Sequence, residues 1–154
     1  MNNQKKMEIK FRLKTIKVEG FSFSELEDST FDINTTIFEF NSGIRVIPEE
    51  ETILILLGTA LFNDPDKKIQ LCNLKVSYEF HVIGLRQFPR KDNTIKIPDD
   101  ILIQFFALAI STSRGILFDK CSGTYLSEII LPLINPATLL PKKQQEVEKT
   151  EQIV

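Results

Sequence analysis

The sequence predicts an α+β fold, in which a four-stranded antiparallel meander sheet carries a long helix and a short C-terminal helix on one face. Two observations lead to this prediction. Apolar and polar residues alternate repeatedly in the first half of the chain, as in half-buried strands, and an apolar segment after residue 98 has the length and start signals of a helix. With 154 residues, 42% hydrophobic and 26% charged, the chain can build one domain with one core.

The first strand is predicted near the N-terminus, where Ile9, Phe11 and Leu13 alternate with basic residues. The apolar residues then move from odd to even positions, at Ile16 and Val18. Such a change of phase usually marks a bulge or a bend. We therefore expect an irregular first strand.

Three further strands are expected. The second covers about residues 31–46 with an irregular middle, and the third, residues 52–62, is an apolar run whose β-branched start and Gly58 favour a strand covered on both faces over a buried helix. A turn at residues 63–66 leads into residues 74–82, where the alternation is the cleanest in the chain. The four strands are expected to follow one another as a meander.

A polar crossover over residues 83–97 is long enough to bring a helix back onto the sheet. Pro98 suits the first helical turn, and the two aspartates that follow it interact favourably with the positive end of the helix dipole. We expect this helix to reach about Phe118, a length of roughly 30 Å at 1.5 Å per residue. Asn135 can cap a short second helix that begins at Pro136.

The long helix is apolar nearly all the way round between residues 101 and 110. Such a helix has to be covered on both sides. The sheet covers one side, and we expect a second subunit to cover the other, because leaving that side wet would forgo several kcal/mol at about 25 cal/mol per Å². The predicted oligomer interface consists of Ile101, Leu102, Phe105, Phe106, Leu108 and Ala109.

The composition argues against several classes of function. The 19 basic and 21 acidic residues give a net charge of −2, which provides no field to attract nucleic acid. The N-terminus has no apolar region typical of a secretory signal, and residues 101–110 are about half of the roughly 20 that a membrane span needs. We therefore expect a cytoplasmic protein without membrane insertion.

Catalytic and metal-binding chemistry is sparse. Ser77, Glu79 and His81 contain the residue types of a catalytic triad, but alternate residues of one strand point the same way in a row. One histidine and two distant cysteines, Cys72 and Cys121, are too few ligands for a metal site, and all glycines are isolated, so a phosphate-binding loop is absent. We expect no enzyme, no metal and no cofactor, and we interpret the cysteines as reduced thiols in the core.

The order of these elements resembles the SecB family, tetrameric chaperones that hold unfolded precursor proteins. The resemblance covers about residues 8–140, between a flexible N-terminus (1–7) and a flexible tail (142–154). It implies a dimer whose sheets join and a pair of dimers packed through their long helices. The matching residues are Phe11, Leu13, Ile16, Ser22, Phe23, Leu71, Cys72, the triplet Ser113-Arg114-Gly115, and Asn135.

The resemblance implies an ATP-independent holdase, which binds unfolded or precursor polypeptides in apolar grooves of a homotetramer, with protein export as one use. In the family, these grooves lie between the sheet, the loop after the long helix and the last helix. A plain core role is the alternative for each residue expected there. The expected groove residues are Phe21, Phe23, Phe38, Phe40, Tyr125, Leu126, Ile129, Ile130 and Leu131.

One departure from the family concerns its motor partner. SecB delivers clients to SecA through acidic side chains on the outer face of the sheet, whereas the corresponding positions here are Gly20, Ser24 and Asn73. The polar face of the first strand is basic instead, with Lys10, Arg12 and Lys14. These changes weaken the expectation of SecA docking. They leave open a SecB-like interaction module dedicated to one partner, such as an antitoxin or a mobile-element protein.

Overall fold

The computed structural model describes residues 9–25, 32–67 and 69–141. The expected flexible ends, residues 1–7 and 142–154, lie outside these ranges and stay predictions. The elements are the strands β1 (Phe11–Phe23), β2 (Ile37–Ile47), β3 (Thr52–Phe62), β4 (Gln70–Val82), β5 (Arg90–Lys91) and β6 (Thr94–Ile95), the helix α1 (Asp99–Cys121), and the 3₁₀ helices η1 (Pro48–Glu50), η2 (Leu85–Gln87) and η3 (Pro136–Leu139).

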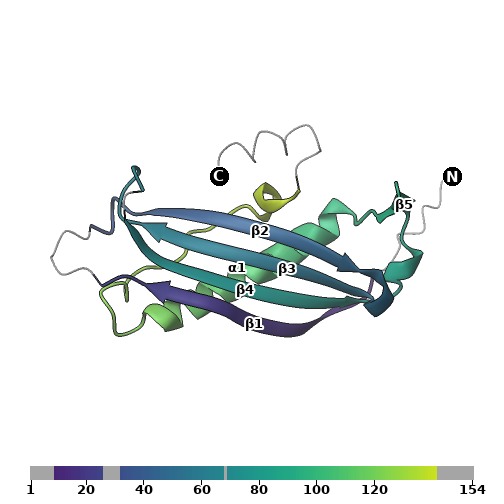
Figure 1. Ribbon diagram of the computed structural model, residues 1–154, viewed down its shortest axis with the longest axis horizontal. Coiled ribbons are helices and arrows are strands. Elements are labelled where there is room, and N and C mark those ends of the chain that lie inside the picture. The colour runs from purple at the N-terminus through teal and green to yellow at the C-terminus, as the bar shows by residue number, and fades with distance from the viewer. Residues whose placement is uncertain (1–8, 26–31, 68, 142–154) are drawn as a thin grey trace.

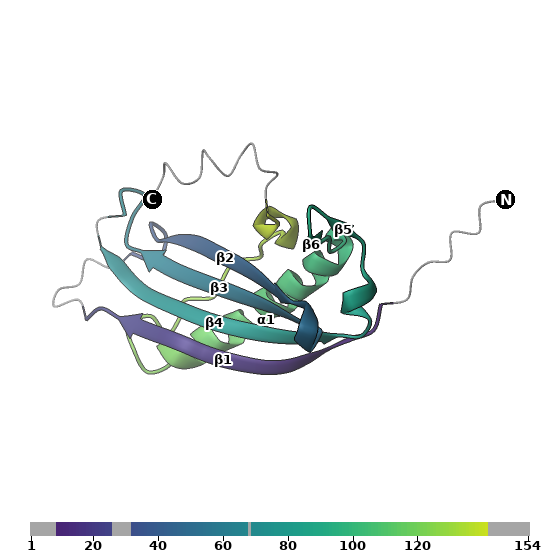
Figure 2. The ribbon, with the colours of Figure 1, turned by 45° about the vertical axis from the view of Figure 1, so that its right-hand side comes forward.

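The four long strands form one antiparallel sheet in the order β1-β4-β3-β2, and α1 lies across one face of it (Figures 1 and 2). The predicted α+β class is confirmed. The meander holds for β2, β3 and β4, but β1 lies beside β4 instead of β2, which is Greek-key order. Residues 24–36 separate β1 from β2, far more than a tight hairpin needs, so local pattern could not identify the neighbour of β1.

The register of β1 agrees with the sequence pattern, whereas the start of β2 differs from it. The register between β1 and β4 shifts between Leu13 and Thr15 and again between Val18 and Gly20, which confirms the predicted irregularity. β2 begins at Ile37, later than expected, because Asp32 starts a turn: its side chain accepts a hydrogen bond from the amide of Asn34 (2.9 Å). Residue 31, the expected start, lies outside the described ranges.

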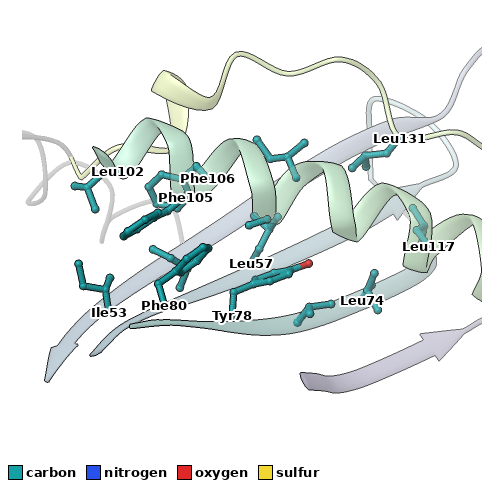
Figure 3. Packing of buried hydrophobic residues seen from close by; sticks show 14 of the residues in the cluster. Ile53, Leu57, Leu74, Tyr78, Phe80, Leu102, Phe105, Phe106, Leu117 and Leu131 are labelled. Carbon is teal, nitrogen blue, oxygen red and sulfur yellow. The ribbon is translucent and has the colours of Figure 1, made fainter. Parts of the chain in front are cut away.

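The core lies between the sheet and α1 (Figure 3). The ring of Phe105 stacks on that of Phe80 with centroids 4.1 Å apart, and Phe11 meets Phe105 edge-on at 4.8 Å. On β3, alternate residues such as Ile55 and Leu57 are fully buried, whereas Leu56 on the opposite face is exposed. The prediction that β3 is covered on both faces is therefore wrong for the single chain, since α1 covers only one.

The helix α1 extends one turn further than expected, and Gly123 follows it at a φ of +77°, a left-handed conformation that suits glycine. By length and composition alone α1 could cross a membrane. Packing in the core explains its apolar residues, because nine positions of the helix are buried in this fold.

Five of the six predicted interface residues belong to the core of the single chain. Ile101, Leu102, Phe105, Phe106 and Ala109 are buried, and Leu108 alone of the six is exposed. The inference that a second subunit must cover these positions is therefore corrected. The chain itself provides the second cover, through residues 126–135, which we call the return segment, and through η3, which packs on α1.

Candidate apolar groove

The helix-facing side of β2 borders an open cleft of about 540 Å³. Phe38 and Phe40 are alternate residues of β2, and their rings stack with centroids 6.3 Å apart. They pair in register with Leu61 and Thr59, which face the core, so both rings point to the α1 side of the sheet. We call this space the aromatic cleft. Its lining comprises Ile33, Thr36, Ile37, Phe38, Phe40, Glu128, Ile129, Ile130 and Pro132.

The return segment forms the other wall of the aromatic cleft. Ile129 and Leu131 are buried, whereas Ile130 is 63% and Leu133 93% exposed. Arg114 of α1 holds this segment in place, because its guanidinium donates hydrogen bonds to the carbonyl oxygens of Leu131 (3.0 Å, from Nε) and Pro132 (3.2 Å, from Nη2). The backbone of the return segment is thus held on α1 by hydrogen bonds, while Ile130 and Leu133 expose their apolar side chains to solvent.

A second cleft of about 540 Å³ lies at the other end of β2. Its apolar lining includes Ile44, Val46 and Leu102, and charged side chains from residues 91–99 border it. Between the two clefts, the Ser42 hydroxyl donates a hydrogen bond to the carbonyl oxygen of Leu139 (3.3 Å), which ties η3 to β2. Asn135 caps η3 as predicted, because its side chain accepts a hydrogen bond from the amide of Ala137.

The nine expected groove residues fall into three groups. Phe38, Phe40, Ile129 and Ile130 come together in the aromatic cleft, and Leu126 and Leu131 are buried in the core. The remaining three lie together at the opposite edge of the sheet, where Phe21 and Phe23 belong to the end of β1. There the Tyr125 ring lies 5.2 Å from that of Phe23, and its hydroxyl donates to the carbonyl oxygen of Ser24 (2.6 Å).

Sequence reasoning missed five residues that line the aromatic cleft: Ile33, Thr36, Ile37, Glu128 and Pro132. It also missed the exposed Leu133, which directly follows Pro132. Ile33 and Ile37 fall within the strand expected over about residues 31–46, whereas in the structure a turn at residues 32–35 precedes β2 and both isoleucines line the cleft. In the structure, buried and exposed residues alternate from Ile129 to Pro132, as in an extended segment, but residues 129–133 are all apolar, so the sequence pattern carries no signal of this wall.

The side chains considered as a catalytic triad have different carboxylate partners in the structure. Ser77 Oγ donates to Glu19 Oε1 (2.7 Å), whereas His81 Nε2 lies 3.8 Å from Glu51 Oε2, so Ser77 and His81 do not share a carboxylate. Within residues 9–25, 32–67 and 69–141, no three His, Cys, Asp or Glu side chains gather as metal ligands.

The two cysteines are free and buried, which confirms their interpretation as core thiols. Burial raises the pKa of Cys72 to about 12, and the neighbouring Cys121 thiol adds to this shift. Burial likewise raises the pKa of Cys121. Both side chains are therefore protonated near neutral pH.

No protein-family model matches the chain, and no curated protein matches its sequence. Among solved structures, it is similar to the SecB-like chaperone Rv1957 of Mycobacterium tuberculosis, solved in complex with a ChAD peptide from the Rv1956 HigA1 antitoxin. The TM-score is 0.58 at 12% identity, over 80% of this chain and 89% of that chain. It is also similar to a protein of unknown function from Streptococcus agalactiae, with a TM-score of 0.45 at 9% identity, over 82% of this chain and 98% of that chain. The long helix on a four-stranded antiparallel sheet is thus a SecB-like fold.

Proposed function

We propose that the protein is an ATP-independent holdase that binds unfolded or precursor polypeptides in a groove along β2, which consists of the aromatic cleft and the second cleft. The observation that supports this most directly is the exposure of Ile130, which lines the aromatic cleft, and of Leu133, which directly follows the lining residue Pro132. A holdase has to offer adaptable apolar surface to segments of many sequences, and isolated monomers rarely leave such surface open without a use. The SecB-like neighbour was solved with a peptide bound, which is consistent with a polypeptide ligand. The proposal includes a cytoplasmic location and no catalytic activity.

A second candidate function is that of a module dedicated to one protein partner, without docking on SecA. Gly20 and Asn73, two of the positions where the resemblance implies carboxylates, line a shallow cleft of about 350 Å³ that also includes Glu19 and Lys75. Glu19 forms an ion pair with Lys17 (3.7 Å), and Lys75 balances its charge within the cleft, so the cleft offers no net negative charge to a basic partner surface. This observation favours a customer that is recognised in the groove and is not passed on to SecA.

The proposal also includes a homotetramer, and two exposed apolar surfaces support it. Leu13, Ile16 and Val18 are exposed on the helix side of β1, which is an edge strand with one side unpaired in the chain. On α1, Leu108 and Phe118 are exposed on either side of Gly115, where an added Cβ would meet nothing within 4 Å. Joining of sheets at β1 and packing of helices around Gly115 would cover both surfaces.

The test is suppression of aggregation by the purified protein. We expect stoichiometric amounts to keep several unrelated, chemically unfolded proteins in solution. Ile130→Asp with Leu133→Asp is expected to abolish this effect, because two carboxylates then border the aromatic cleft and both side chains are exposed enough to leave the fold intact. Ile83→Asp is the matched control, since Ile83 is 58% exposed and lies away from the groove.

The outcomes separate the two candidates. Protection of several unrelated clients supports the holdase. Protection of a single partner, lost in the same double variant, supports the dedicated module. Equal activity of the double variant and the Ile83→Asp control would contradict both, because the groove would then not be the binding surface.

A further inference from the structure

The outer face of β1, turned away from α1, carries a row of cations. Arg12 pairs in register with His81, and Lys17 with Ser77, while Lys75 of β4 lies beside Gly20. Lys14 occupies the first register shift, and Lys10 continues the strand, because its carbonyl oxygen accepts a hydrogen bond from the amide of Ile83 (2.9 Å). We call this row the basic edge. It consists of Lys10, Arg12, Lys14, Lys17 and Lys75.

Most of these cations have no anionic partner among residues 9–25, 32–67 and 69–141. Lys17 forms an ion pair with Glu19 (3.7 Å), but among the described residues Lys10, Arg12, Lys14 and Lys75 make none. Three carboxylates lie near the row: Glu19, Glu51 and Glu79. Glu19 also accepts from Ser77, and Glu51 lies against His81. Five cations thus face three carboxylates, in a chain whose net charge is −2.

Each end of the basic edge has a shallow cleft. At one end, the exposed apolar side chain of Ile83 lies beside Lys10, Arg12 and His81, in a space of about 260 Å³ that Phe11, whose ring packs in the core, also borders. At the other end, Gly20 and Lys75 line the cleft of about 350 Å³. Gly20 lies eight positions after Arg12 in β1, which corresponds to roughly 26 Å of extended chain at about 3.3 Å per residue.

We propose that the basic edge is a docking surface for an acidic peptide segment of a partner protein, bound in extended form with an apolar side chain against Ile83. The free cations supply the attraction, and the apolar cleft sets the position of the segment. A nucleic acid fits this surface less well. Glu19 and Glu79 interrupt the row where a continuous phosphate backbone would pass, and a net excess of two cations is small for binding that rests on many phosphate contacts.

This surface is independent of the groove along β2 and compatible with the proposed oligomer. Side chains of a strand stand perpendicular to the sheet, so pairing of two β1 edges leaves the outer face open. Two rows of cations then lie side by side in the joined sheet, which strengthens the local positive potential.

The experiment measures binding of a fluorescein-labelled peptide with alternating Glu and Ser and one terminal Phe, by fluorescence anisotropy at low and high salt. We expect the affinity to fall about tenfold or more in Arg12→Glu with Lys14→Glu, and to fall with salt. The control Arg90→Glu with Lys120→Glu changes the net charge equally at exposed positions elsewhere and is expected to bind within about twofold of the unmodified protein. Arg12→Gln with Lys14→Gln repeats the test should the reversed charges disturb β1.

Three outcomes would overturn the proposal. One is the absence of binding at low salt, and another is an equal loss in the control variant. The third is tighter binding of an oligothymidylate of equal length through Arg12 and Lys14, which would identify nucleic acid as the occupant. Aggregation suppression by the Arg12 and Lys14 variants is expected to be normal, so failure of this proposal is distinguishable from failure of the holdase.

Discussion

Three consecutive residues of α1 have three different surroundings. The hydroxyls of Ser113 and Tyr78 are 2.5 Å apart in the core, which fixes α1 on β4, and Arg114 holds the return segment. Gly115 faces open space on the exposed side of the helix. Since glycine costs roughly 1 kcal/mol relative to alanine inside a helix, its presence there has no explanation within the single chain and fits close approach of a second helix.

Thr59 offers a test of polar burial. Its side chain is 2% exposed on the core side of β3, and its hydroxyl has no hydrogen-bond partner in the structure. Thr59→Val keeps the shape and removes an unpaired hydroxyl, so we expect the free energy of unfolding to rise by about 1 kcal/mol in urea denaturation. Thr52→Val is the control, because the Thr52 hydroxyl donates to the carbonyl oxygen of Glu50 (3.1 Å), and its loss is expected to destabilise. A destabilised Thr59→Val variant would contradict the prediction.

The buried thiols predict the response to alkaline pH. The pKa of Cys72 rises from 9.0 to about 12 on folding, chiefly through burial, so the folded chain binds this proton more tightly than the unfolded chain. The stabilisation is complete below pH 9 and is lost as pH rises from about 9 towards 12. In Cys72→Val, the slope of unfolding free energy against pH is expected to be shallower over this window. Identical slopes in both proteins would contradict the assignment.

At the scale of elements, the local sequence pattern predicted the features that depend on residues close together in the sequence. Alternation identified β1 and β4, and the β-branched start of an apolar run with Gly58 identified β3. The change of phase at Ile16 predicted the irregular register, and Asn135 predicted η3. The neighbour of β1 and the second cover of α1 were not predictable in this way. Both depend on contacts between residues far apart in the sequence, such as Arg114 with Leu131, and a periodicity carries no information about which segment returns to cover a face.

Arg114 is expected to control the order of the return segment. Arg114→Ala removes two hydrogen bonds to backbone carbonyl groups, so amide hydrogen exchange over residues 129–134 is expected to accelerate, and the free energy of unfolding to fall by about 1–3 kcal/mol. Arg86→Ala is the matched control, because the Arg86 guanidinium donates to the carbonyl oxygens of Pro48 and Glu49 at another loop. Acceleration of the same amides in both variants would show that Arg114 has no specific role there.

At the scale of the whole molecule, the groove was predictable only in part. Phe38, Phe40, Ile129 and Ile130 share one cleft because β2 and the return segment border the same edge of the sheet. The other expected residues are apolar for a different reason: Leu126 and Leu131 fill the core, and Phe23 packs on Tyr125 at the far edge. Apolar character alone does not separate a binding surface from a core, since both require it.

The assembly gives the last prediction, which concerns mass in solution. Light scattering is expected to give a multiple of the 17.7 kDa chain mass, with four copies for the unmodified protein. Leu108→Asp is expected to reduce the assembly to dimers, because a carboxylate buried between two helices costs several kcal/mol without a partner. Ile16→Asp is expected to disrupt the contact at β1, because it places an unpaired carboxylate in the proposed interface between the two sheets.

Leu56→Asp is the control for both variants. Leu56 and Leu108 are each 42% exposed, but Leu56 lies on the outer face of the sheet, which the proposed tetramer leaves uncovered. The mass of this variant is therefore expected to stay that of the tetramer. A monomeric unmodified protein at micromolar concentration would contradict the proposed assembly, and Gly115 would then need another explanation. Dissociation by Leu56→Asp, with Leu108→Asp and Ile16→Asp still assembled, would show that the interface lies on the outer face, where the basic edge is.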